Sequence, residues 1–242
     1  TIGITDVDKD RLRLAAAAIE NAGGSPKSYV FDVADYAEFA KAVIDFDDSY
    51  GGIDIGINNA GVGCAGLLHE TSIELFRKVI DINLMGVVNG CHLFVPIMRR
   101  QRSGHILNIA SAAAFVSAPT MSAYNVSKAG VLSLSETLRA ELNDEGVLVS
   151  VLMPTYVRTN IGNDSLGTTE GKRHAHLLVE ESKIIANDVA RETLEKMHRG
   201  VFYIIMPNQA RFLWRFKRLM PDAFAAFIVK EVKKKLLSLR ES

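Results

Sequence analysis

The chain has 242 residues, of which 48% are hydrophobic and 23% are charged, and its formal net charge is zero. This length suits one domain of moderate size or two small ones, with enough apolar residues for a well-filled core. The balanced charge gives no overall bias toward nucleic acid, so no nucleic-acid partner is expected. Cys64 and Cys91 lack the spacing of a disulfide framework or a C-x-x-C motif, which predicts reduced core thiols in a cytoplasmic protein.

Strands and helices are predicted to alternate along the chain. The apolar runs that favour strands lie at residues 2–5, 28–31, 53–57, 105–110, 147–153 and 201–205. The helical patterns between them lie at residues 9–22, 35–49, 72–100, 121–143 and 187–198. Residues 160–180, rich in Gly, Ser, Thr and Asn, predict a mobile loop that could include a short helix. Apolar strands separated by helices are typical of a parallel sheet covered on both faces, so we expect a doubly wound α/β fold with three α/β/α layers.

Polar residues and glycines mark the predicted helix ends. Asp8 is placed to cap the first helix, and Gly23 and Gly24 are placed to end it. Thr71 and Glu74 predict a capping box at the start of the long helix that follows them.

Polar or turn-forming residues follow most of the predicted strands. They are Asp6, Asp32, residues 58–61, Ser111 and Pro154. Because the carboxyl ends of parallel strands meet at one edge of a sheet, where ligands bind, these residues predict a single site.

One stretch carries a pattern suited to proton transfer, with Ser111, Tyr124 and Lys128 in that order. The spacing of four places Tyr124 and Lys128 on one helix face, where an ammonium favours the phenolate and makes the phenol a usable general acid or base. The Ser111 hydroxyl, at a strand end, could hold a substrate oxygen against that phenol. A Tyr followed at four by a Lys is expected about 0.3 times in a chain of this composition. The pair alone therefore also fits a solvated helix face. The order of the surrounding residues decides between that explanation and a proton-transfer site.

That order resembles the short-chain dehydrogenase/reductase family, from Ile2 to about Pro207. The residues that carry the resemblance are Asn58, Asn59, Ala60, Gly61, Asn83, Ser111, Tyr124, Lys128, Pro154 and Thr159. The resemblance implies a Rossmann-like fold and a nicotinamide-dependent oxidation of alcohols or reduction of carbonyls.

The resemblance also implies roles for four catalytic residues. Tyr124 would be the acid/base, and Lys128 would lower its pKa and hydrogen-bond the nicotinamide ribose. Ser111 would orient the substrate oxygen. Asn83 would anchor a water in a proton relay that reaches Lys128, although taken alone an Asn in a helix more often satisfies a local backbone kink.

A larger set of residues is implied to contact the cofactor. They are Asp6, Asp32, Val33, Asn59, Ala60, Gly61, Tyr124, Lys128, Pro154, Val157 and Thr159. The turn at 58–61 would lie against the adenosine, where small residues let the backbone come close, and it is equally a tight turn after a strand. Asp32 would meet the adenine, although a lone Asp is more often a helix cap. Residues 154–159 would wrap the nicotinamide, and no metal ligands are assigned.

Asp6 bears on the choice between NAD and NADP. A carboxylate at the end of this strand hydrogen-bonds the ribose hydroxyls of NAD and repels the 2′-phosphate of NADP. Asp8 already serves the helix start, and no Lys or Arg lies within two residues of Asp6. NAD is therefore expected, with NADP as the alternative.

The family's glycine-rich turn, which holds the pyrophosphate at a helix N-terminus, does not occur in this sequence. Residues 2–6 align with the family's second strand, so we expect either a strand, turn and helix before Thr1 or a natural deletion compensated by a partner or by the C-terminal segment. Loss of that first strand would leave its neighbours unpaired. The G-x-G-x-x-G pattern from Gly61 to Gly66 is not expected to replace the turn, because the next helix is capped only at Thr71.

The C-terminal part differs in composition from the rest. We divide the chain into a catalytic domain at 1–207 and a basic amphipathic extension at 208–242. Residues 209–242 hold nine Lys and Arg against three Asp and Glu, with aromatic residues between them. This segment fits a helical lid over the substrate pocket or a neighbouring subunit, a surface for an anionic membrane, or a solvated terminal helix. All three place an apolar rim near the site, which favours a hydrophobic substrate.

The predicted function is an NAD(P)-dependent oxidoreductase that interconverts a secondary alcohol and a ketone, or a primary alcohol and an aldehyde. The alternative is a non-catalytic nucleotide-binding or scaffold protein of the same fold. The expected partners are a small-molecule alcohol or carbonyl substrate and further copies of the chain. The resemblance implies a homodimer or homotetramer formed through the long helices. Peripheral membrane contact through 209–242 is the remaining partner hypothesis.

Overall fold

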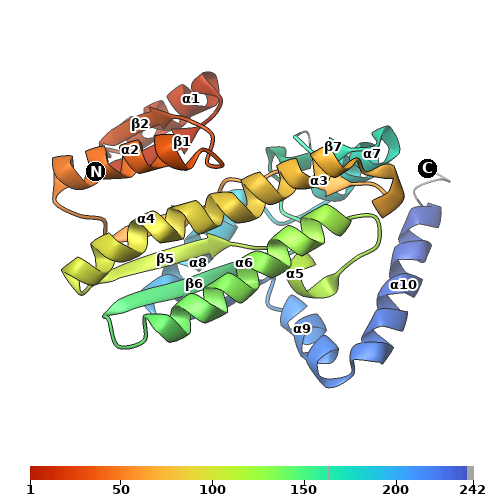
Figure 1. The fold of residues 1–242 in the computed structure, drawn as a ribbon. Helices are drawn as coiled ribbons and strands as arrows, with labels where there is room; N and C mark the ends of the chain where they lie inside the picture. Colours follow the sequence, from red (N-terminus) through yellow and green to blue (C-terminus); the bar gives the residue numbers. More distant parts are fainter. Residues whose placement is uncertain (163, 239–242) are drawn as a thin grey trace.

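The structure, a computed structural model, describes residues 1–162 and 164–238 (Figure 1). Its strands are β1 (Ile2–Asp6), β2 (Pro26–Val30), β3 (Ile55–Asn58), β4 (Cys64–Ala65), β5 (Gly104–Ile109), β6 (Val147–Pro154), β7 (Leu166–Gly167) and β8 (Tyr203–Met206). Its longer helices are α1 (Lys9–Asn21), α2 (Tyr36–Tyr50), α3 (Ile73–Ile80), α4 (Gly86–Gln101), α5 (Ala113–Val116), α6 (Ser122–Glu141), α7 (Thr169–Glu180), α8 (Ala186–His198), α9 (Ala210–Leu219) and α10 (Pro221–Ser238). Three single turns complete the list: η1 (Leu68–Glu70), the π-turn η2 (Asp81–Met85) and η3 (Asn160–Gly162). The expected alternation of strands and helices is confirmed.

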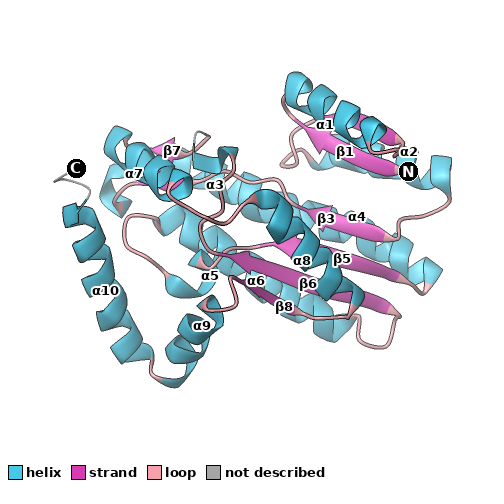
Figure 2. Cartoon of the chain, turned by 180° about the vertical axis from the view of Figure 1, so that it is seen from behind, coloured by secondary structure: helices cyan, strands magenta, loops and turns pink. Residues whose placement is uncertain are grey.

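The described strands form three separate parallel sheets, the smallest of which is the β4–β7 pair. Strands β3, β5, β6 and β8 form one parallel sheet in that order, and β1 pairs only with β2, also in parallel (Figure 2). In β3, Gly56 and Asn58 face inward and are buried, whereas Ile55 and Ile57 on the other face are 52% and 47% exposed. Among the described residues, β1 pairs with β2 and β3 pairs with β5, so β1 and β3 lie in different sheets.

The β1–α1–β2–α2 unit is held to the rest by the packing of α2 on α4 (Figures 1 and 2). The rings of Phe39 and Phe94 meet edge to face, with their centroids 5.9 Å apart. The buried amide of Asn89 donates a hydrogen bond to the Val33 carbonyl at 2.9 Å. The unit is thus fixed through a helix pair rather than through a shared strand.

The long central helix begins one residue later than predicted. Ser72 is the N-cap of α3, accepting a hydrogen bond from the Leu75 amide at 3.2 Å, while the Thr71 hydroxyl turns back to the Leu67 carbonyl. The predicted capping box of Thr71 and Glu74 is therefore wrong. The continuous helix from residue 73 to residue 101 is long and apolar enough to span a bilayer, but its buried side chains pack in the globular core, as in many soluble folds.

Residues 160–180 are more ordered than predicted. The segment contains η3, β7 and the twelve-residue helix α7, which Thr168 caps by accepting a hydrogen bond from the Gly171 amide at 3.1 Å. The prediction of a loop is therefore wrong for Thr169–Glu180, where the helix that the prediction left open has twelve residues. The rejection of the Gly61–Gly66 pattern as a phosphate-binding turn agrees with the structure, since the short strand β4 lies within the pattern and the single turn η1, rather than a long helix, follows it.

The C-terminal extension begins as part of the main core. Ala210 is buried, and Trp214 lies 5.2 Å from the Tyr203 ring of β8. Helix α10 packs on α9 through Phe216 and Phe224, whose ring centroids are 5.5 Å apart. Residues 239–242 of the predicted extension lie outside the described residues.

A buried polar network crosses the sheet beneath the site. Asn58 and Asn108 are register partners in β3 and β5, and the Asn58 amide donates to the Asn108 Oδ1 at 2.8 Å. Asn108 donates in turn to the Ser135 hydroxyl of α6 at 3.0 Å, and Ser135 donates to the Val131 carbonyl at 2.7 Å. Cys91 lies against both asparagine side chains and, like Cys64, is a free buried thiol.

Candidate active site

The structure brings together the three side chains that the sequence singled out for proton transfer. Ser111 follows β5, and Tyr124 and Lys128 lie one turn apart at the start of α6. Tyr124 is 8% exposed and Lys128 is 3% exposed. The Lys128 ammonium lies 5.8 Å from the centre of the Tyr124 ring and donates a hydrogen bond to the Ile109 carbonyl at 2.9 Å. A solvated helix face, the alternative explanation of this spacing, is excluded by that burial.

The Ser111 hydroxyl is oriented by the backbone around it. It accepts a hydrogen bond from the Ala113 amide at 3.1 Å and lies 3.5 Å from the Pro154 carbonyl. It is also close enough to the Tyr124 phenol for hydrogen bonding to lower the phenol's pKa. This arrangement joins the end of β5, the start of α6 and the end of β6 at one point.

Burial dominates the electrostatics of the pair. It raises the pKa of Tyr124, an effect that the Ser111 hydroxyl opposes, and it lowers the pKa of Lys128 to about 8. The net direction for Tyr124 is opposite to the lowering expected from the ammonium alone. In this state the phenol is therefore a proton donor at neutral pH, and it becomes a base only when the surroundings favour the phenolate more strongly.

Asn83 joins the central helix to the turn before β4. It is fully buried in η2, where its amide accepts from the Val62 N–H at 2.8 Å and donates to the Val62 carbonyl at 2.9 Å and the Ser127 hydroxyl at 3.2 Å. A Cβ on Gly61 would lie 3.0 Å from Asn83 Oδ1 and 3.4 Å from Lys128 Nζ. The Asn83 side chain thus positions the Gly61 turn against Lys128. It does so from the irregular π-turn η2, which is the kind of local backbone kink that the sequence analysis gave as the alternative role for this residue.

The surroundings of Tyr124 are apolar. Cys64, Val79 and Ala123 pack around it, and Ile161 and Leu166 of the 160–168 segment lie against the same cluster. The cavities of about 310 and 420 Å³ beside α9 and along α8 contain none of the predicted site residues. Ile161 and Leu166 therefore form part of the apolar surroundings of the phenol.

The other residues predicted to bind the cofactor lie at strand ends around this centre. Asp6 ends β1, Asp32 and Val33 follow β2, and Asn59 and Ala60 form the exposed turn after β3. The Asp32 carboxylate accepts from the Ala34 amide at 2.9 Å, and Asp35 rather than Asp32 caps α2.

On the opposite side, Pro154, Val157 and Thr159 continue from β6. Val157 packs with Leu152 and Met206, whereas the Thr159 hydroxyl is exposed and lies 3.4 Å from the Val157 carbonyl. These residues thus form the wall beyond β6.

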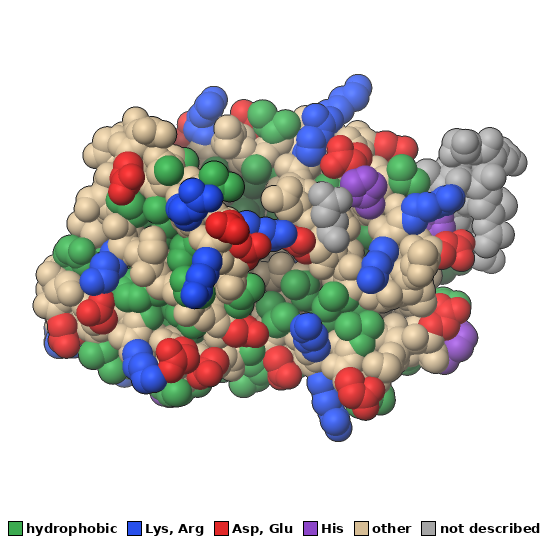
Figure 3. Space-filling model, turned by 90° about the horizontal axis from the view of Figure 1, so that it is seen from above, with side chains coloured by type: hydrophobic (Ala, Val, Ile, Leu, Met, Phe, Trp, Pro, Cys, Tyr) green, Lys and Arg blue, Asp and Glu red, His purple; other side chains and the backbone are tan. Residues whose placement is uncertain are grey.

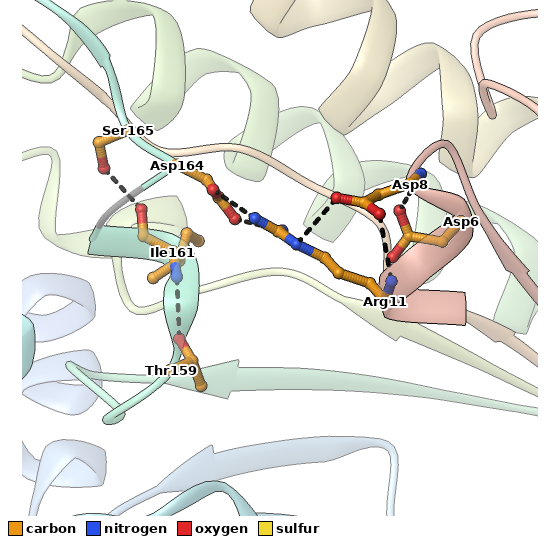
Figure 4. Close-up of polar contacts among 7 residues, drawn as sticks. All are labelled: Asp6, Asp8, Arg11, Thr159, Ile161, Asp164 and Ser165. Carbon is orange, nitrogen blue, oxygen red and sulfur yellow. Dashed lines mark hydrogen bonds and ion pairs between the residues drawn. The ribbon is translucent and has the colours of Figure 1, made fainter. Parts of the chain in front are cut away.

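An arginine links the two sides. Arg11, in the first turn of α1, makes a bidentate ion pair with Asp164 at 2.6 and 2.9 Å (Figure 4). Its charge also interacts with Asp8 and Asp6, and the Asp6 carboxylate accepts from the Asp8 amide at 2.9 Å. Figure 4 shows that this chain of contacts runs from the end of β1 toward the Thr159 segment. In the view of Figure 3, acidic and basic side chains gather beside a shadowed hollow near the centre of the face.

This contact changes the charge argument made for Asp6. The hydrogen bond and charge of Arg11 hold the pKa of Asp164 below its usual value, and the same guanidinium lies within electrostatic range of Asp6. This cation is not among the neighbours of Asp6 along the chain. Local sequence gives no signal for it, because Arg11 and Asp164 are 153 residues apart.

Tyr156 is a second residue that the sequence argument passed over. Its charge raises the pKa of Tyr124, which places the two phenols near each other, and burial raises the pKa of Tyr156 itself. Its position between Pro154 and Val157 was a usable signal, because that segment was already assigned to the site.

The comparison with known proteins agrees with this geometry. A profile described as "short chain dehydrogenase" matches residues 1–169. The probable oxidoreductase EphD of Mycobacterium tuberculosis is 40% identical over 177 residues, which cover 71% of this chain and 30% of that protein. The 3beta-hydroxysteroid dehydrogenase 1 of Eggerthella lenta is 34% identical over 174 residues, covering 71% of this chain and 66% of that protein.

A solved structure gives the same result for the fold. A short-chain dehydrogenase/reductase from Burkholderia phymatum in complex with NAD is 31% identical and superposes with a TM-score of 0.83, covering 90% of this chain and 85% of that one. The divided sheet is thus a Rossmann-like arrangement. The chain spans only 30% of the length of the mycobacterial relatives that it matches. From the family profile, the fold and these relatives together, the chain belongs to the short-chain dehydrogenase family.

Proposed function

We propose that the protein is a nicotinamide-dependent oxidoreductase that interconverts an alcohol and a carbonyl group, with Tyr124 as the acid/base. The observation that carries the proposal is a buried phenol within hydrogen-bonding reach of a serine hydroxyl, with a buried ammonium 5.8 Å from the centre of its ring. A phenol in this position can give a proton to a carbonyl oxygen during reduction or take one from an alcohol during oxidation. Ser111 holds the substrate oxygen beside that proton.

The residues present fit a nicotinamide cofactor at two points. The backbone at Asn59 and Ala60 is exposed, and Gly61 brings it close to Lys128. The Lys128 ammonium has three N–H donors, and the hydrogen bond described for it uses one of them, so it can also donate to a ribose hydroxyl. When bound, the cofactor supplies the hydride chemistry. No described residue is assigned to the pyrophosphate.

The choice of cofactor rests on Asp6. Its carboxylate at the end of β1 favours ribose hydroxyls over a 2′-phosphate, which supports NAD. Arg11 opposes this preference, because its guanidinium lies near Asp6. The ion pair with Asp164 engages that cation, so we propose NAD as the preferred cofactor. A comparison of Kd for NADH and NADPH tests the preference, and tighter binding of NADPH would contradict it.

An apolar alcohol or ketone is the substrate class that the site favours. Aliphatic and aromatic side chains surround Tyr124. Burial of an apolar substrate against them contributes about 25 cal/mol of favourable free energy per Å² of apolar surface removed from water. The name of the Eggerthella relative, a hydroxysteroid dehydrogenase, points in the same direction.

The decisive experiment replaces Tyr124 with Phe. Turnover of apolar secondary alcohols with NAD should fall by at least about 100-fold, since general acid/base catalysis contributes roughly 10²–10⁴-fold. Binding of NADH, measured by calorimetry, should remain within about threefold. Tyr36→Phe serves as the matched control, because this tyrosine is 44% exposed and its hydroxyl contacts His92 away from the site.

Equal turnover by the Tyr124→Phe protein and the parent would reject the assignment of the acid/base. Failure of the parent chain to bind NADH would instead favour the non-catalytic scaffold of the same fold.

A further inference from the structure

A cavity beside α9, away from Tyr124, carries an unusual concentration of positive charge. It has a volume of about 310 Å³. Its lining residues are Arg139, Val201, Phe202, Tyr203, Ile205, Arg211, Trp214 and Arg215. The lining therefore contains three guanidinium groups, an aromatic wall and no carboxylate.

The three arginines have no carboxylate partner among the described residues. Arg139 stacks on the Phe202 ring at 4.7 Å, and Arg211 and Arg215 lie one turn apart on α9. The nearby Glu136 is engaged by the Tyr203 hydroxyl at 2.7 Å and by Arg218 at 3.6 Å. The cavity therefore fits an anion with several oxygen atoms, which guanidinium groups bind through paired N–H donors.

Apolar side chains project next to the charged stripe. Phe212 and Leu219 are 70% and 80% exposed, and they occupy the stripe of α9 adjacent to Arg211 and Arg215 at 100° per residue. Met220, 57% exposed, lies in the turn between α9 and α10, which forms an outer corner of the molecule in Figure 1. Helix α9 has four basic residues and no acidic one.

We propose that this corner, defined by the arginine cavity and by Phe212, Leu219 and Met220, docks the protein on an anionic phospholipid surface. The cavity receives a lipid phosphate headgroup, and the three apolar side chains enter the boundary between headgroups and acyl chains. A dissolved anion would fill the cavity but leave the apolar side chains in water. An anionic bilayer satisfies both features at once, as it does for basic amphipathic helices in general.

The test measures flotation of the whole protein with phosphatidylcholine vesicles and with vesicles containing 30% phosphatidylglycerol. The protein should bind the anionic vesicles at least about tenfold better, and added salt should release it. Arg211→Glu with Arg215→Glu should reduce binding at least about tenfold, and Phe212→Ser should reduce it several-fold. Arg191→Glu with Arg199→Glu is the matched control, since these exposed arginines, in α8 and at its C-cap, give the same change in net charge and should leave binding unchanged.

Several results would overturn the proposal. These are equal binding to neutral and anionic vesicles, an equal loss in the α8 control, or release by millimolar inorganic phosphate at constant ionic strength, which would indicate a site for a free anion. Sedimentation measures the oligomeric state of the parent and of the α9 variants. If the α9 substitutions dissociate an oligomer, the corner is an interface between copies of the chain and the membrane proposal is wrong. Tyr124→Phe should bind vesicles like the parent, so this test stands independently of the oxidoreductase assignment.

Discussion

Replacing Lys128 with Met should change the way in which stability depends on pH. Burial lowers the pKa of the Lys128 ammonium from 10.5 to about 8 in the folded chain. Because the folded-state pKa lies below the unfolded value, the folded protein loses this proton first on alkaline titration. The buried ammonium therefore lowers the free energy of unfolding by its full amount below pH 8. This destabilisation disappears as the pH rises from 8 toward 10.5, so the free energy of unfolding increases over that range.

The expected magnitude follows from that shift. Between pH 7 and pH 9.5, a group with these two pKa values adds about 2 kcal/mol to the free energy of unfolding. The group is 3% exposed, so solvent does not screen the effect appreciably. Lys128→Met abolishes the titration. It also removes the hydrogen bond to the Ile109 carbonyl, at a cost of about 1.5–3 kcal/mol while the amine is charged, and any change of that bond with pH is part of the same titration.

Urea unfolding at pH 7 and pH 9.5 measures the difference between the parent and the variant. The parent should gain about 2 kcal/mol relative to Lys128→Met over this interval, and comparing the two proteins cancels the other groups that titrate. The exposed Lys78, replaced in the same way, should produce no such difference. A difference between parent and variant that stays constant across the interval would refute the account of the ammonium as a buried charge.

Two further changes probe the surroundings of the site. Gly61→Ala places a Cβ 3.0 Å from Asn83 Oδ1 and 3.4 Å from Lys128 Nζ, so overpacking should lower the free energy of unfolding, measured with urea, by about 1–3 kcal/mol. An unchanged unfolding midpoint would show that the Asn83 and Lys128 side chains can move to make room. Arg11→Ala and Asp164→Ala should each speed thermolysin cleavage of the segment that carries Asp164, because either change removes the same bidentate pair. The double variant should be cleaved no faster than the single ones, and additive rates would argue against a shared contact.

The sequence predicted the fold and the central part of the site because both depend on local patterns. The apolar runs placed the strands to within a few residues, and the spacing of Tyr124 and Lys128 placed both on one helix face. The end of β5 carries Ser111 to Tyr124, whereas Asp6 and Asp32 lie at strand ends of the separate β1–β2 sheet.

The errors arose where distant contacts decide. Thr71 and Ser72 are both good caps, and only the contact of the Thr71 hydroxyl with Leu67 shows which of them begins the helix. Helix α7 has few apolar residues in its first turns, and it forms where Gly162 allows close packing of the helix, since a Cβ there would lie 3.1 Å from the backbone of His176.

The expected lowering of the pKa of Tyr124 was wrong for the same reason. The sequence shows the ammonium four residues away, but the burial that raises the pKa of Tyr124 and lowers that of Lys128 depends on the fold.

The asparagine pair beneath the site also selects one alignment of the strands. Asn58 and Asn108 meet only when β3 and β5 are matched as they are here. A slip of two residues would keep the same faces inward but separate the amides, leaving buried polar groups without partners at about 1–3 kcal/mol each. Aliphatic side chains at these positions would tolerate such a slip. The two amides therefore destabilise folded states with the wrong strand register. Because Ser111 follows β5, the same register sets the position of Ser111 relative to the Tyr124 phenol.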